Sequence, residues 1–161
     1  MANLSGRCMC GAVTWTCSGE IMRSLVCHCA DCRRATSSPF TAFLAVSPDT
    51  VSWSGEIVQY ESTPATFRGF CPSCGSRLFF RSDRWPHEVH IHAATMSSPD
   101  EYRPTAQVMM RSRLPWLDQL GPLPTYEGFQ QSPTNQRSAE ASGDGHAAAG
   151  SGGRHGGPAG S

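Results

Sequence analysis

Three cysteines within six residues constrain this chain more than any other feature of its sequence. They are Cys27, Cys29 and Cys32, in the segment CHCADC. Side-chain packing alone does not explain a spacing this tight. Three sulfur atoms converge on one point when a thiophilic metal ion attracts them, and zinc is the simplest such ion. The segment therefore predicts a metal site with three cysteine ligands.

Two further cysteine pairs flank this segment, Cys8 with Cys10 upstream and Cys71 with Cys74 downstream, and a glycine follows each pair. The downstream pair has the spacing of a zinc knuckle, in which the glycine lets the backbone turn so that amide N–H groups point at the sulfurs. A knuckle supplies only two ligands, so a second pair is required. We expect the two pairs to form one closed structural zinc site that contributes to folding. Alternatively, one cysteine of the central segment completes the knuckle.

The division into four and three sulfurs would leave the central site open. Zinc held by three cysteines keeps one exchangeable position, which is the arrangement of catalytic sites. A histidine could close this site, and the candidates are His28, His87, His90 and His92. His28 lies between two ligands on an extended segment and is therefore expected to face away from the metal. His90 and His92 share one face of a predicted strand, where a histidine pair more often belongs to the surface or core than to a ligand set.

Eight cysteines would also fit four disulfides. We favour metal, because the C-x-C spacing offers poor geometry for an internal bridge. The chain also lacks a secretory signal pattern, and it has no apolar run near the length of about 20 residues that spans a bilayer. These features predict a soluble, cytoplasmic protein whose thiols stay reduced. The eighth cysteine, Cys17, has no partner at ligand spacing and is expected to lie in the core.

Composition divides the chain near Gln130. We predict a zinc-binding domain over residues 3–128 and a disordered tail, rich in Gly, Ser and Ala, over residues 129–161. The 13 basic and 13 acidic residues give a formal net charge of zero and are dispersed along the chain. An electrostatic case for a nucleic-acid partner or a membrane surface is therefore missing.

Short segments of alternating or continuous apolar residues, separated by Gly, Pro or Ser, predict a mainly β domain of antiparallel sheets with little helix. The expected strands are residues 12–17, 24–26, 40–46, 50–53, 57–61, 65–70, 78–81, 88–93 and 106–110. In the first of these, Val13, Trp15 and Cys17 share one face. One helical turn is expected at residues 33–36. Trp116 is expected either to cover the core or to form the wall of a pocket.

Charge arithmetic indicates which substrate an open site would accept. Zinc with three thiolates carries a net charge of minus one, so a substrate thiol bound there would lose its proton and remain nucleophilic. Arg33 and Arg34 follow Cys32 directly. These two arginines either offset the anionic charge, hold a carboxylate of the molecule that carries the thiol, or are solvated at the surface.

The cysteine motifs closely resemble those of the glutathione-dependent formaldehyde-activating enzyme (GFA) family, which includes centromere protein V-like proteins. The resemblance covers about residues 3–117 and is carried by residues 7–13, 27–34, 60–62 and 68–76. It implies a β-tent fold of antiparallel sheets stapled by zinc. It also implies one structural and one catalytic zinc per chain. The structural zinc would be held by Cys8, Cys10, Cys71 and Cys74, and the catalytic zinc by Cys27, Cys29 and Cys32.

The resemblance further implies a carbon–sulfur lyase that adds glutathione to formaldehyde, giving S-hydroxymethylglutathione. A small-molecule thiol and an aldehyde would then be the partners. The catalytic zinc would bind the glutathione sulfur as a thiolate, which attacks the carbonyl carbon, and water or His28 would return a proton to the new alkoxide. The chain departs from many relatives at Gln107-Val108, where they have a His-Ile pair. Two other hypotheses are a non-enzymatic zinc module for a protein or nucleic-acid partner and a thiol redox or metal-buffer protein.

Overall fold

The computed structural model describes residues 3–129. Contacts divide the chain into two units, the first of which ends at Gly121, and every helix and strand of the described residues belongs to this first unit. The predicted mainly β architecture with little helix is confirmed. The predicted tail lies outside the described residues, apart from Phe129. Within residues 3–129, no helix is both long and apolar enough to cross a membrane.

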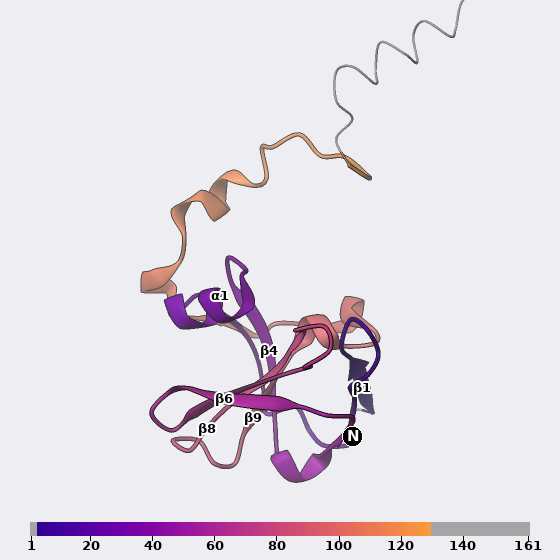
Figure 1. Ribbon diagram of the computed structural model, residues 1–161. Helices are drawn as coiled ribbons and strands as arrows, with labels where there is room; N and C mark the ends of the chain where they lie inside the picture. Colours follow the sequence, from indigo (N-terminus) through magenta and orange to yellow (C-terminus); the bar gives the residue numbers. More distant parts are fainter. Residues whose placement is uncertain (1–2, 130–161) are drawn as a thin grey trace, which may run out of the picture. The chain divides into compact units, whose positions relative to one another are not determined.

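The strands form two sheets (Figure 1). The smaller sheet has the order β1 (Leu4–Arg7), β2 (Thr14–Cys17) and β5 (Val51–Ser54). The larger sheet has the order β10 (Ala106–Val108), β3 (Arg23–Cys27), β4 (Thr41–Val46), β9 (Val89–His92), β8 (Arg77–Ser82), β7 (Thr66–Phe70) and β6 (Val58–Thr63). The single α-helix of the described residues is α1 (Ala30–Thr36). The 3-10 helices there are η1 (Pro48–Thr50), η2 (Ala93–Thr95), η3 (Pro99–Glu101), η4 (Met110–Ser112) and η5 (Pro115–Gln119).

The strand pairing differs from the prediction at two places. Strand β1 was not predicted, because its sequence LSGR has no apolar alternation; pairing with β2 in the register Leu4 opposite Cys17 holds it in the sheet. Strand β10 pairs with β3 in parallel, with Ala106 opposite Leu25. Between β9 and β10 the chain passes through η2 and η3. This long connection allows β10 to lie beside β3 in the parallel direction. The other strand pairs in residues 3–129 are antiparallel, as expected.

The main core joins the two sheets. The predicted buried face of β2 is confirmed, because Trp15 and Cys17 are each 1% exposed and Val13, just before the strand, is fully buried. The Trp15 ring lies 6.4 Å from that of Trp53 on β5, which lies 5.1 Å from the ring of Phe79 on β8. This aromatic series connects the small sheet to the large one. Cys17 thus belongs to the core, as its isolated position in the sequence predicted.

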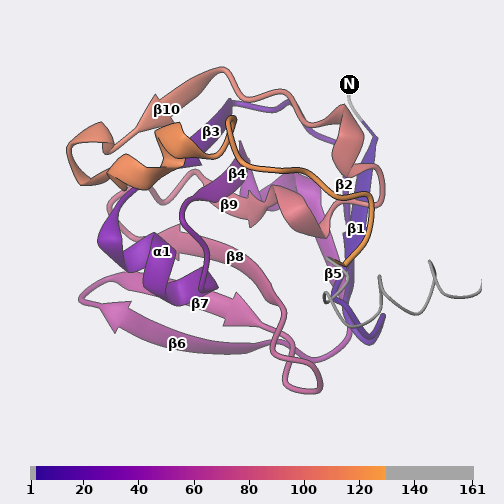
Figure 2. The same ribbon diagram turned by 90° about the horizontal axis from the view of Figure 1, so that it is seen from above.

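Helix α1 is positioned by the strand that precedes it. Strand β3 ends at Cys27 and α1 begins at Ala30, so the three central cysteines span the junction between an extended segment and a helix. The helix ends at Ser37, whose backbone is left-handed with φ of 50°. In both views, α1 and β1 lie at opposite sides of this unit (Figures 1 and 2). The turn expected at residues 33–36 is therefore the second half of a longer helix.

Candidate functional site

The two flanking cysteine pairs meet in one group, although 61 residues separate Cys10 from Cys71. Cys8 and Cys10 follow β1, and Cys71 and Cys74 lie in the turn between β7 and β8. All four Sγ atoms lie within 4.8 Å of one another, with distances of 3.5 Å from Cys8 to Cys10 and 3.8 Å from Cys10 to Cys71. Four sulfurs bound tetrahedrally at about 2.3 Å to zinc lie about 3.8 Å apart. The spacing therefore fits a structural zinc site.

The backbone of this group has the turn that the trailing glycines predict. Gly11 and Gly75 have φ of 81° and 72°, in the left-handed region that favours glycine. The Gly75 N–H donates to the Cys71 carbonyl at 2.8 Å, which closes the turn. The Val13 N–H donates to the Cys8 Sγ at 3.2 Å, an interaction that stabilises a thiolate.

The three central cysteines form a second group, whose Sγ atoms also lie within 4.8 Å of one another. Cys29 is the N-cap of α1, and its Sγ accepts the Cys32 N–H at 3.2 Å. Hydrogen bonds from the thiols of Cys27 and Cys32, and from backbone N–H groups of the helix, lower the pKa of Cys29 to about 2. The three sulfur atoms of the C-x-C-x-x-C segment converge because β3 ends at Cys27 and α1 begins at Ala30. All eight cysteines of the chain are free.

The three-cysteine group has no fourth His, Cys, Asp or Glu ligand among residues 3–129. His28 is 2% exposed, and its Nε2 lies 2.9 Å from Oε1 of Gln107 on β10. Its ring packs against Phe40 at 5.9 Å between ring centroids. His28 therefore belongs to neither cysteine group. Gln107, at which this chain differs from many relatives, is the residue that contacts His28. His87 is exposed and also lies outside both groups.

The His90 and His92 side chains pack against the Phe43 ring and belong to neither cysteine group. Both are 7% exposed, and both rings stand nearly perpendicular to the Phe43 ring, with centroid distances of 5.8 and 5.0 Å. Phe43 in turn packs against Cys27 and Cys32. Burial lowers the pKa of His92 to about 3, with a further contribution from nearby arginines, so its imidazole is neutral at pH 7. Both histidines are buried, and neither belongs to a cysteine group.

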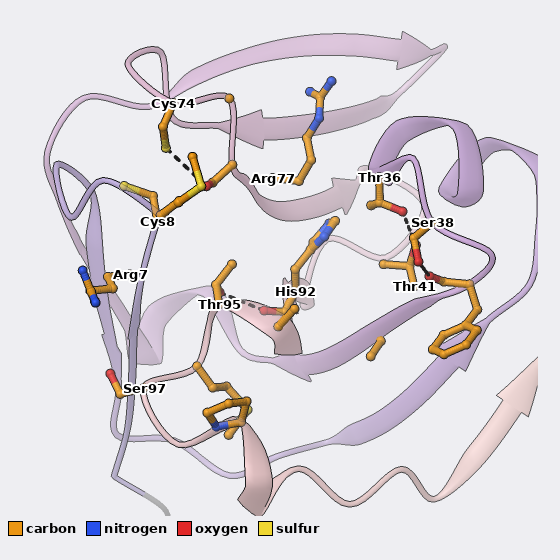
Figure 3. A pocket seen from close by; sticks show the side chains of 18 residues that line it. Arg7, Cys8, Thr36, Ser38, Thr41, Cys74, Arg77, His92, Thr95 and Ser97 are labelled. Carbon is orange, nitrogen blue, oxygen red and sulfur yellow. Dashed lines mark hydrogen bonds between the residues drawn. The ribbon is translucent and has the colours of Figure 1, made fainter. Parts of the chain in front are cut away.

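A cavity with a volume of about 860 Å³ lies between the four-cysteine group and α1. Figure 3 shows Cys8 and Cys74 on one side of it, Thr36 on the other, and His92 between them. A second cavity of about 450 Å³ is lined by Arg33, Arg34 and Trp116. Trp116, which is 46% exposed, thus forms the wall of a pocket rather than a cover over the core.

Sequence reasoning did not assign a role to two arginines near α1. Arg68 on β7 is 5% exposed, and Arg77 on β8 lines the cavity of about 860 Å³. Arg68 is the single arginine of β7, whereas β8 carries both Arg77 and Arg81. Arg68 and Arg77 line one cavity together with Asp31 and Arg34 of α1. The one available signal was an arginine within the largely apolar segment 65–70.

Fold and site together define a two-sheet β protein with one four-cysteine and one three-cysteine group, each able to hold a metal ion. The glutathione-dependent formaldehyde-activating enzyme family model matches residues 3–112. An uncharacterized lyase of Schizosaccharomyces pombe is 32% identical over 93 residues, which cover 58% of this chain and 68% of that protein. The chain belongs to the glutathione-dependent formaldehyde-activating enzyme family.

A solved structure supports the fold. The crystal structure of a Rhodobacter sphaeroides protein is similar with a TM-score of 0.53, at 19% sequence identity. The similarity covers 64% of this chain and 98% of the Rhodobacter sphaeroides chain. At this level of identity the likeness concerns the path of the backbone alone.

Proposed function

We propose that this protein is a zinc-dependent carbon–sulfur lyase that joins a thiol, such as glutathione, to formaldehyde or a related small electrophile. The observation that carries the proposal is the three-cysteine group at the β3–α1 junction, which has no fourth protein ligand within residues 3–129. Membership of the family and the similarity to a protein named as a lyase support the same reaction class. A cytoplasmic location, where thiols stay reduced, suits this chemistry.

The two cysteine groups would hold different zinc ions. The structural zinc would be held by Cys8, Cys10, Cys71 and Cys74, and the catalytic zinc by Cys27, Cys29 and Cys32. The donor sets fit these roles, because four sulfurs complete a tetrahedral site and three leave one position exchangeable. A catalytic zinc would lower the pKa of a substrate thiol, so that its sulfur is nucleophilic at neutral pH.

Residues around the three cysteines would prepare the reaction. Phe43, Phe80 and Val108 pack against them and keep water from the inner side of the group, which strengthens electrostatic interactions there. The Cys32 N–H fixes the position of the Cys29 sulfur. These contacts favour a rigid site in which only the outer side admits substrate.

The proposed addition balances without a further reactant. The thiol sulfur forms a bond to the carbonyl carbon, the π electrons of the carbonyl move to its oxygen, and the proton lost by the thiol ends on that oxygen. Arg33 and Arg34 follow Cys32 and border a cavity, where we propose that they hold a carboxylate of the thiol carrier. Proton return by water or by His28 stays a prediction.

The test is the rate of S-hydroxymethylglutathione formation from glutathione and formaldehyde, measured by NMR exchange spectroscopy. We expect purified zinc-loaded protein to raise this rate above the spontaneous one. Removal of zinc with a chelator should abolish the increase, and added zinc should restore it. A folded protein with two zinc ions and no acceleration with glutathione or other thiols would contradict the proposal, and would favour a non-enzymatic zinc module.

A further inference from the structure

His92 is a buried imidazole whose ring nitrogens have no hydrogen-bond partner among residues 3–129. The residue is 7% exposed, and the hydrogen bonds it forms there use its backbone, as when Thr95 Oγ1 donates to the His92 carbonyl at 2.8 Å. The neighbouring His90 differs, because its Nε2 lies 3.1 Å from Glu88 Oε2. Buried polar groups nearly always have a partner, so an exception calls for a ligand or water. His92 therefore has one N–H donor and one acceptor free.

The His92 ring faces the cavity of about 860 Å³. Figure 3 shows the ring extending from β9 into the space between Arg77 and Thr36. The threonine hydroxyls of the lining already donate to backbone carbonyls, Thr36 and Thr41 to that of Cys32 and Thr95 to that of His92. A hydroxyl has one proton to donate. The ring N–H of His92 is thus a neutral donor that remains available to a molecule in this cavity.

The surroundings of His92 favour negative charge on such a molecule. The cavity is lined by Arg7 and Arg77 and by no carboxylate of residues 3–129. Burial, and then the charges of Arg68 and Arg77, lower the pKa of His92 to about 3, so the ring is neutral at pH 7. The same positive charges stabilise an oxyanion at this place. A neutral imidazole of low pKa polarises a carbonyl by donating a hydrogen bond to its oxygen.

The strand register places His92 on the same sheet face as Cys27. Cys27 lies opposite Thr41 in the pairing of β3 with β4. Phe43, two residues further along β4, lies opposite His92. Residues two apart in a strand, and residues opposite each other in neighbouring strands, share a face. Because Thr41 also lines the cavity and contacts the Cys32 carbonyl, a thiol at the three-cysteine group has this cavity on its side of the sheet.

We infer that His92 donates a hydrogen bond to the carbonyl oxygen of the electrophile and stabilises the negative charge that this oxygen gains. The inference rests on the proposed function and adds a catalytic residue to it. When the thiol sulfur bonds to the carbonyl carbon, the π electrons move to the oxygen. His92 keeps its own proton throughout, and the proton lost by the thiol ends on the oxygen as before.

The first test is independent of turnover and uses formamide, a stable carbonyl compound that thiols do not attack. Zinc-loaded protein with 15N-labelled histidine is titrated with formamide, within the range that leaves its circular dichroism unchanged. We expect a saturable NMR shift of the His92 ring nitrogens while those of His90 stay constant. The spectra of His92→Phe and His90→Phe assign the signals, since each lacks one set. An unchanged His92 signal, or equal and unsaturable changes at both histidines, would overturn the inference.

The second test is the kinetics of thiol addition. We expect His92→Phe, which keeps a ring beside Phe43 but has no donor, to lower kcat about 100-fold or more with little change in the KM for the thiol. His92→Gln restores an N–H donor and should recover most of the activity. The same loss in His92→Gln would assign a packing role to the ring and overturn the inference.

His90→Phe is the matched control. His90 is as buried as His92 and also stands perpendicular to Phe43, but it does not line the cavity, and Glu88 keeps its ion pair with Arg23. The control should retain a kcat close to that of the wild type, and an equal loss in both phenylalanine variants would contradict the inference. If wild-type protein binds formamide at His92 but accelerates no thiol addition, the carbonyl site stands and the proposed reaction fails.

Discussion

Replacing Cys74 by Ser is expected to leave the purified chain unfolded and without its structural zinc. The four-cysteine group ties the segment after β1 to the turn between β7 and β8, and Cys8 and Cys71 in it are 1% and 0% exposed. Structural zinc contributes an apparent free energy of about 10–16 kcal/mol in small zinc-binding peptides. This exceeds or equals the whole stability of a domain, about 5–15 kcal/mol. Circular dichroism and elemental analysis measure the outcome.

The matched control for this variant is Cys17→Ala. Cys17 is as buried as Cys8, but it lies in the core and belongs to no metal-binding group. We expect this change to cost about 1–2 kcal/mol through the small cavity it leaves, with both zinc ions retained. A Cys74→Ser protein that folds with unchanged zinc content would contradict the structural role of the group.

Replacing Cys29 by Ser should affect activity rather than folding. The protein should remain folded, lose about one zinc per chain, and lose about 100-fold or more of its thiol-addition activity, since even indirect contacts to a metal are worth 10–100-fold. Serine is a good N-cap, so α1 keeps the cap that the Cys29 sulfur now provides. Loss of activity would thus reflect the missing sulfur ligand rather than a melted helix. Equal unfolding of the Cys29 and Cys74 variants would show that the two groups have no separate roles.

Much of the fold was predictable because local patterns of apolar, polar and turn residues mark most of its strands. Period-two alternation located β2 and its buried face at Trp15 and Cys17, and short apolar segments between turn residues located eight further strands. Strand β1 was missed, because its place in the sheet depends on pairing with β2 and not on its own sequence. The direction of β10 was missed for a similar reason. A short strand carries no signal for parallel pairing with a distant neighbour.

The candidate site also has a part that the sequence predicted and a part that it did not. Cysteine spacing and trailing glycines favoured a division of the seven sulfurs into four and three, and the structure brings the sulfurs together in these two groups. The cavity lined by Arg34, Arg68 and Arg77 was not predictable, because α1, β7 and β8 are distant in the sequence and come together only in the folded chain. The alternatives for Trp116 also required the structure, which places it at a cavity wall with Arg33 and Arg34.

The central claim is that one metal site is closed and the other accepts an incoming thiol. Cadmium-113 NMR of the cadmium-substituted protein tests it most directly, because the chemical shift reports the number of sulfur ligands. We predict two resonances, of which only one shifts when glutathione is added, and Cys29→Ser should remove that resonance. A single resonance, or two that glutathione leaves unchanged, would contradict the account.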